Sequence, residues 1–140
     1  MGVFIDTGFY FALISNRDLK HPRSIELLQE MTEGNLGKIV TTDYIFDETM
    51  TLLNFRTQGK RIDLLLKMEQ LFIGTDPLAE MHAINTEWFE EIGKMQRKVT
   101  QEGNPFSFTD ASNIICCQKR GIRNIISFDG QFKGILEVLE

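Results

Sequence analysis

Two short apolar segments of the sequence run directly towards an acidic residue. Val3-Phe4-Ile5 is followed by Asp6, and Ile125-Ile126-Ser127-Phe128 is followed by Asp129. A short, unbroken apolar run is typical of a buried strand in an α/β sheet, and such sheets bind ligands just beyond the carboxyl ends of their strands. The two aspartates are therefore predicted to face one shared crevice.

Two further acids occur in predicted helices that would turn them towards the same region. Glu48 lies three residues after Ile45 and four before Leu52, so the three side chains share the helical face that is turned to the core. The neighbouring Asp47 points about 100° away and is expected to be solvated. Asp110 stands at the beginning of a helix that follows a short Ser-Phe-Thr segment.

Each of these acids has an ordinary explanation when it is taken alone, as a helix cap, a turn former or the partner of an arginine. Four together are harder to explain in that way, because clustered carboxylates repel one another and buried charge is costly. A hard divalent cation relieves that cost, and Mg²⁺ and Mn²⁺ prefer oxygen ligands. No cysteine–histidine spacing indicates zinc. Asp6, Glu48, Asp110 and Asp129 therefore predict a Mg²⁺ or Mn²⁺ site.

The elements that must position these acids alternate between strand and helix patterns. Strands are predicted at Val3–Ile5, Lys38–Thr41, Leu71–Ile73 and Asn124–Ser127. Helices are predicted at Thr7–Ile14, from His21, from Asp43 through Leu53, at Ile62–Leu71, Asp76–Met81, from Asn85 through Val99 and at Asp110–Arg120. This alternation favours an α/β sandwich around a mainly parallel sheet.

The composition is that of one globular domain spanning residues 1–140, with 42% hydrophobic and 25% charged residues. The formal net charge of -5 would ordinarily count against binding to nucleic acid. Two divalent cations held by the acids would add four positive charges and bring the net charge to about -1. The net charge therefore does not exclude binding to nucleic acid.

The two cysteines, Cys116 and Cys117, are adjacent in a predicted helix, where neighbouring side chains diverge. Free thiols fit a reducing, cytoplasmic setting. The sequence shows no signal-like segment and no apolar run of membrane-spanning length. We therefore expect a soluble cytoplasmic protein with no membrane segment.

Several short motifs, in order along the chain, resemble the PIN domain family. The spacing is most similar to that of the VapC-like toxins of bacterial and archaeal toxin–antitoxin pairs. The resemblance covers Val3 to about Phe132 and rests on these segments: Phe4-Ile5-Asp6-Thr7, Thr41-Thr42-Asp43-Tyr44-Ile45-Phe46-Asp47-Glu48, Phe106-Ser107-Phe108-Thr109-Asp110-Ala111, Gly121-Ile122 and Ser127-Phe128-Asp129-Gly130-Gln131-Phe132.

The resemblance implies a three-layer, Rossmann-like α/β/α sandwich and a Mg²⁺- or Mn²⁺-dependent endoribonuclease. By position, Asp6, Glu48 and Asp110 would be the core metal-binding acids and Asp129 the more variable fourth. Supporting positions would be the hydroxyls of Thr7 and Thr109, together with Asn113, which stands where many relatives have serine. Gly130 departs from the pattern, because a larger polar residue often follows the last acid in the family.

The resemblance also implies an RNA substrate, an antitoxin partner and a homodimer. Lys94, Arg97 and Lys98 precede the loop that leads to Asp110, and we expect them to help hold the RNA backbone.

Three other interpretations stay open. The chain could be a catalytically silent PIN-like module that binds RNA or protein, or a PIN nuclease that processes RNA without being a toxin. A small phosphotransfer domain is disfavoured, because Thr7-Gly8 follows Asp6 without a second acid and no glycine-rich phosphate loop occurs.

Overall fold

The computed structural model describes residues 1–140, and its five strands form a single parallel sheet. The strand order is β3-β2-β1-β4-β5, and every neighbouring pair is parallel. The strands are β1 (Gly2–Ile5), β2 (Lys38–Thr42), β3 (Glu80–His82), β4 (Asn124–Ile126) and β5 (Glu137–Leu139). The mainly parallel sheet predicted from the sequence is confirmed.

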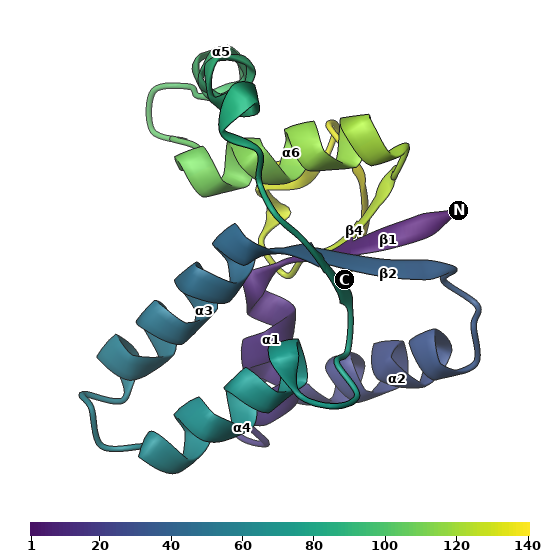
Figure 1. The fold of residues 1–140 in the computed structure, drawn as a ribbon, viewed down its shortest axis with the longest axis vertical. Coiled ribbons are helices and arrows are strands. Elements are labelled where there is room, and N and C mark those ends of the chain that lie inside the picture. The colour runs from purple at the N-terminus through teal and green to yellow at the C-terminus, as the bar shows by residue number, and fades with distance from the viewer.

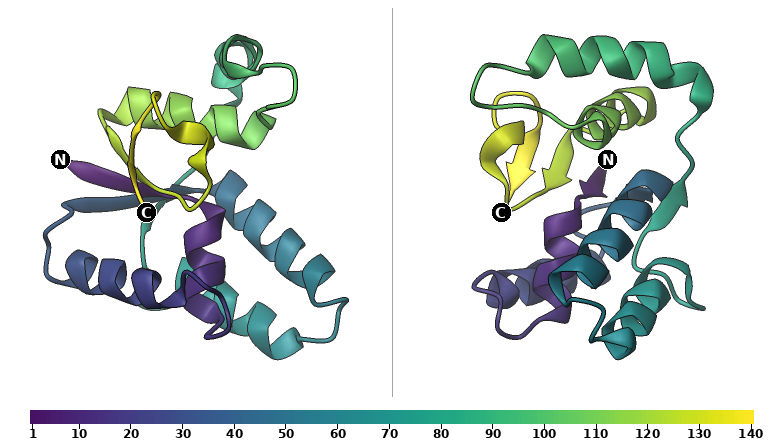
Figure 2. Two further views of the ribbon diagram at one scale, coloured as in Figure 1. Left: turned by 180° about the vertical axis from the view of Figure 1, so that it is seen from behind. Right: turned by 90° about the vertical axis from the view of Figure 1, so that its left-hand side faces the viewer.

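Helices cover both faces of this sheet and complete a three-layer α/β/α sandwich (Figure 1). One face carries α1 (Thr7–Ile14), α2 (His21–Thr32), α3 (Asp43–Arg56) and α4 (Ile62–Ile73). The other carries α6 (Phe108–Arg120), with α5 (Phe89–Val99) packed on the outer side of α6 (Figure 2). Short 3-10 helices span Thr86–Trp88 and Gly130–Phe132. No helix combines the length and apolar character needed to cross a membrane.

The central strand β1 marks the point where the strand order reverses. The chain passes from β1 to β2 and β3 on one side, and later returns to β4 and β5 on the other. Such a reversal opens a crevice beyond the carboxyl ends of the strands. Asp6 follows β1 and Ser127 follows β4, and the backbone N–H of Asp6 donates to the carbonyl of Ile126 at 3.1 Å. The fold therefore places both strand ends at one crevice.

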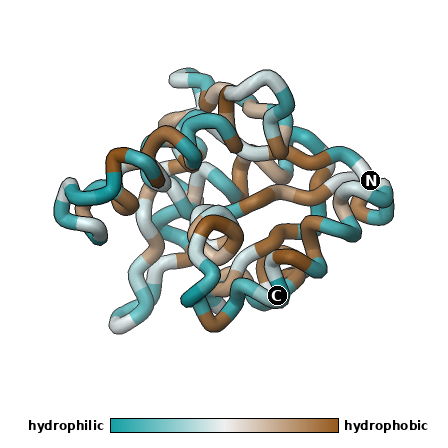
Figure 3. Tube along the Cα trace, turned by 90° about the horizontal axis from the view of Figure 1, so that it is seen from below, coloured by the Kyte–Doolittle hydropathy of each residue, from teal (hydrophilic) through white to brown (hydrophobic).

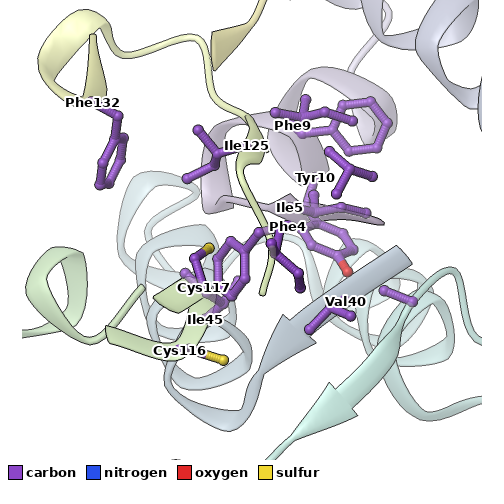
Figure 4. Close-up of a cluster of buried hydrophobic side chains, with 14 of the residues drawn as sticks. Phe4, Ile5, Phe9, Tyr10, Val40, Ile45, Cys116, Cys117, Ile125 and Phe132 are labelled. Carbon is purple, nitrogen blue, oxygen red and sulfur yellow. The ribbon is translucent and has the colours of Figure 1, made fainter. Parts of the chain in front are cut away.

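The core surrounds β1, which is buried along its length. Figure 3 shows a hydrophobic stretch of the trace close to the N-terminus. Phe4 and Ile5 are completely buried, and the ring of Tyr10 stacks on Phe72 with centroids 4.0 Å apart. Figure 4 shows Cys116 and Cys117 beside this core with their sulfur atoms pointing in different directions. Both thiols are free, as predicted, and both are buried.

The predicted strand at Leu71–Ile73 is wrong, because these residues form the last turn of α4. Met68 and Phe72, four residues apart, are both buried, whereas Ile73 is 53% exposed. The apolar run therefore follows the helical period beyond Leu71, where the helix is predicted to end. The short run alone does not distinguish the end of a buried helix from a strand.

The helix predicted at Asp76–Met81 is also wrong, since Glu80–His82 forms strand β3, and the sequence pattern does not predict β5 at Glu137–Leu139. Both are three-residue strands at the edges of the sheet and neither contains a fully buried residue. An edge strand of this kind lacks the apolar run that identifies β1, because one of its sides faces solvent. Pairing with β2 and β4 defines these strands.

Candidate active site

A pocket of about 480 Å³ lies beyond the carboxyl ends of β1 and β4. All four acids singled out in the sequence line it. A larger hollow of about 710 Å³ lies between the end of α6 and β5, but Glu137 is its only acidic residue. The smaller pocket is therefore the candidate site. Acids, hydroxyl-bearing residues, two cations and four other residues line it: Asp6, Asp18, Glu48, Asp110 and Asp129; Thr7, Ser107 and Ser127; Lys20 and Arg56; and Gly8, Phe11, Leu52 and Phe128.

Asp6 lies deepest among these acids, with only 7% of its surface exposed. Its Oδ1 caps α1 by accepting the N–H of Thr7 at 2.8 Å, and its Oδ2 accepts the hydroxyl of Ser127 at 3.1 Å. Burial raises the pKa of Asp6 to about 7, and the charges of Asp110 and Glu48 add to this shift, while the bonds from Thr7 and Ser127 oppose it. The site therefore disfavours the ionised form unless a cation is near.

Glu48 reaches the pocket from α3, which begins at Asp43. The hydroxyl of Thr42 caps this helix by accepting the N–H of Ile45. The Oε1 of Glu48 accepts the hydroxyl of Thr7 at 2.6 Å. Desolvation is the main cause that raises the pKa of Glu48. Asp47 beside it is exposed, as predicted.

Asp110 and Asp129 each combine a capping role with a place in the pocket. Asp110 forms a capping box with Ser107, whose hydroxyl accepts the N–H of Asp110 at 2.9 Å. Asp129 accepts the N–H of Gln131 at 3.3 Å, and its own N–H donates to the hydroxyl oxygen of Ser127 at 3.2 Å. Asp110 and Asp129 therefore do have the capping roles that an acid in such a position ordinarily has. The same hydrogen bonds orient their carboxylates towards one pocket.

The predicted supporting residues are placed less uniformly. Thr7 lines the pocket, whereas Thr109 and Asn113 do not. Asn113 is completely buried, one turn after Asp110, and its amide forms no hydrogen bond with another protein group. The three basic residues predicted to hold RNA are exposed on α5 and line no part of this pocket: Lys94, Arg97 and Lys98.

Sequence reasoning misses several lining residues. Arg56 lies eight residues after Glu48 with Leu52 midway, a helical spacing that could have indicated it. Ser127 belongs to one of the family-like motifs, but nothing in the motif itself predicts its role. Ser107 also belongs to a family-like motif and stands three residues before Asp110, the spacing of a capping box. Nothing in the sequence connects Asp18 or Lys20 to this pocket.

The donor set fits a hard divalent cation in its chemistry. No three acidic, histidine or cysteine side chains stand close enough together to form a ready-made ligand cluster. Mg²⁺, however, is commonly held by one or two carboxylates and keeps several waters. The carboxylates and hydroxyls around Asp6 offer oxygen atoms alone. Burial, together with the charges of Asp110 and Glu48, raises the pKa of Asp6. A cation would offset this unfavourable charge.

Comparison with known proteins identifies the family. The model of the PIN domain family matches residues 3–136. The chain belongs to the PIN domain family. The resemblance inferred from the motifs is thereby confirmed, and PIN nucleases generally use divalent metal ions.

This PIN domain is similar in sequence to two VapC ribonucleases. A VapC ribonuclease of Archaeoglobus fulgidus is 29% identical over 135 residues, which cover 94% of this chain and 80% of the relative. The 23S rRNA-specific endonuclease VapC20 of Mycobacterium tuberculosis is 26% identical over 146 residues, which cover 97% of each chain.

Solved structures share the fold of this PIN domain. The crystal structure of M. tuberculosis VapC20, a sarcin-ricin loop cleaving toxin, superposes with a TM-score of 0.74 at 24% identity and covers 94% of this chain and 92% of that one. VapBC2 from Rickettsia felis, solved bound to a DNA fragment from its promoter, gives a TM-score of 0.68 at 13% identity over 99% of this chain and 98% of that one.

Proposed function

We propose that this PIN domain is a Mg²⁺- or Mn²⁺-dependent endoribonuclease and the toxin of a toxin–antitoxin pair. The observation that carries the proposal is the convergence of Asp6, Glu48, Asp110 and Asp129 on one pocket at the switch point of the sheet. These acids come from four separate segments of the chain. Relatives of the chain are named as VapC ribonucleases and endonucleases.

Carboxylate oxygens from these acids would hold the cation, with waters completing its coordination, and the residues around them would orient the carboxylates. A bound Mg²⁺ or Mn²⁺ would supply a nucleophile from water at neutral pH and stabilise charge on the phosphodiester. Thr7 holds Glu48 through its hydroxyl, and Ser127 contacts both Asp6 and the backbone of Asp129. This shell of hydrogen bonds fixes side chains that would otherwise repel one another.

An antitoxin and a second copy of the chain are the proposed protein partners. Relatives of the same fold have been solved as VapBC2 and as FitAB on DNA. The α3–α4 pair also exposes large apolar side chains, with Phe55 74%, Ile62 69% and Leu66 58% exposed. Covering apolar surface of this kind favours association. With its free buried thiols, the protein is proposed to act in the cytoplasm.

The proposal is tested by incubating the purified chain with total RNA in EDTA, in Mg²⁺ and in Mn²⁺, and by mapping new RNA ends. We expect cleavage only with a divalent cation. A catalytically silent module would leave the RNA intact under all three conditions, and calorimetric titration would show whether it binds Mn²⁺ at all.

A further inference from the structure

Two cations stand in the acidic pocket without an acidic partner. Lys20 and Arg56 line the pocket together with five carboxylates. Neither side chain forms a salt bridge or a hydrogen bond with any of them. Both residues are exposed, so solvent and ligands can reach their charges.

Aromatic rings hold these cations in place. The ammonium of Lys20 lies 5.7 Å from the ring centroid of Phe128, and the guanidinium of Arg56 lies 4.6 Å from that of Phe11. Both distances are within the range of a cation–π contact. Since a ring face attracts the cation but leaves its N–H groups free, each side chain keeps its hydrogen-bonding capacity for another anion. The five carboxylates likewise form no ion pair with Lys20 or Arg56.

The two cations flank the acids from different sides of the central strand. Arg56 is the last residue of α3, which follows β2, and stands about 12 Å along the helix axis from Glu48. Lys20 rests on Phe128, which follows β4 and precedes Asp129. Because β2 and β4 lie on opposite sides of β1, Arg56 and Lys20 bracket the pocket into which Asp6 is directed.

We infer that Arg56 and Lys20 bind the phosphates on either side of the scissile phosphate of one RNA strand. The inference rests on the proposed function and names the substrate class more narrowly. A polynucleotide carries a negative charge at every linkage, so a strand that places one phosphate at the acids presents its neighbours to the flanking cations. A ligand with a single phosphate cannot use all three positions. Interactions of this type position the strand and read no sequence.

Equilibrium binding in an Asp110→Asn background separates strand binding from cleavage. The probes are a fluorescent ten-nucleotide oligouridylate, followed by anisotropy, and unlabelled UpU, which has one phosphate, as competitor. Lys20→Gln and Arg56→Gln are compared with Lys67→Gln and Arg123→Gln, which remove exposed charges outside the pocket. All measurements contain Mn²⁺ and are repeated across a range of salt concentrations.

We expect each pocket variant to bind the decamer about tenfold more weakly, as removal of a hydrogen bond to a charged group implies. The slope of log K against log salt should fall by about 0.7 for each phosphate that the variant no longer neutralises. UpU affinity and the melting temperature should stay unchanged, and both control variants should match the background.

Decamer affinity equal to that of the controls would overturn the inference. An equal weakening for UpU and the decamer would also overturn it, because the cations would then bind the scissile phosphate. The inference would also be overturned if the Asp110→Asn protein, with Lys20 and Arg56 intact, failed to bind the decamer at low salt. These results are distinguishable from failure of the proposed function, which would be seen as an absence of cleavage by the wild-type chain in Mn²⁺.

Discussion

The hydroxyl of Thr7 donates a 2.6 Å hydrogen bond to Oε1 of Glu48, a residue 41 positions later in the chain. The backbone N–H of the same threonine donates to Oδ1 of Asp6 at 2.8 Å. One residue at the start of α1 therefore orients two of the proposed metal-binding acids. A second hydroxyl, that of Thr49, donates to the Oγ1 of Thr7 at 3.2 Å and completes the chain of bonds.

Replacing Thr7 with valine should lower the rate of RNA cleavage roughly ten- to a hundredfold, because the variant cannot donate to the charged carboxylate while its shape is kept. Thr7→Ser is the matched control, since it retains the hydroxyl and should keep most of the activity. The measurement is cleavage at fixed RNA concentration together with Mn²⁺ affinity. Wild-type activity in Thr7→Val would show that this bond does not position Glu48.

Asp6→Asn and Asp110→Asn should abolish cleavage yet leave the metal-free protein as stable as the wild type, or more so. Removing one charge relieves repulsion in the pocket. Asparagine also caps helices well, so the bonds that Asp6 and Asp110 accept from Thr7 and Ser107 can persist. Thermal melts in EDTA provide the test.

Metal should reverse this ranking of stabilities. A ligand at a hundredfold excess over Kd stabilises the native wild type by about 2.7 kcal/mol, and variants that lack a carboxylate should gain less. Asp47→Asn is the control, because its exposed side chain should affect neither stability nor cleavage. If Asp6→Asn and Asp110→Asn melt far below wild type in EDTA, these acids serve the fold and not a metal.

The stability of the metal-free protein should fall as pH rises from about 4 to about 7. Burial raises the folded pKa of Asp6 from its ordinary value of 3.8 to about 7. The native state therefore holds a proton in this range that the unfolded state has released, and its advantage is lost as pH rises through the folded pKa. Urea melts across this range should show a shallower pH dependence for Asp6→Asn. An equal slope in both proteins would contradict the raised pKa.

Cleaved RNA should carry 5′-phosphate and 3′-hydroxyl ends. Attack by water on the phosphorus with the 3′-oxygen as leaving group breaks the P–O3′ bond and leaves these ends, whereas attack by the ribose 2′-hydroxyl displaces the 5′-oxygen and leaves a 2′,3′-cyclic phosphate. EDTA should stop the reaction and Mn²⁺ or Mg²⁺ should restore it. Ligation of adapters that require a 5′-phosphate is the measurement, and cyclic phosphate ends would rule out the proposed chemistry.

The isolated chain should form a homodimer in solution. Its α3–α4 pair exposes Phe55, Ile62 and Leu66, and burying this surface would stabilise association. Light scattering at micromolar concentration should give twice the monomer mass of 16.1 kDa. A double substitution, Phe55→Ser with Leu66→Ser, should shift the population towards the monomer, and a monomeric wild type would contradict the expectation.

The sequence alone determined the parts of this protein that depend on local pattern. The apolar run before Asp6 identifies β1, because a strand buried on both faces is apolar at every position. Helical spacing places Glu48 on an inward face and Asp47 in solvent. Gly121 marks the predicted end of α6, and its φ of 67° is the left-handed conformation that glycine adopts at low cost.

Only the tertiary structure decided the edges of the sheet and the surroundings of the acids. β3 and β5 carry no apolar run of their own, since an edge strand is defined by pairing with its neighbour. The cation–π pair of Lys20 and Phe128 joins residues 108 positions apart, and the bond between Ser127 and Asp6 joins residues 121 positions apart. No local pattern encodes such pairs, because their proximity arises only when β4 returns beside β1 and brings distant segments of the chain to the same crevice.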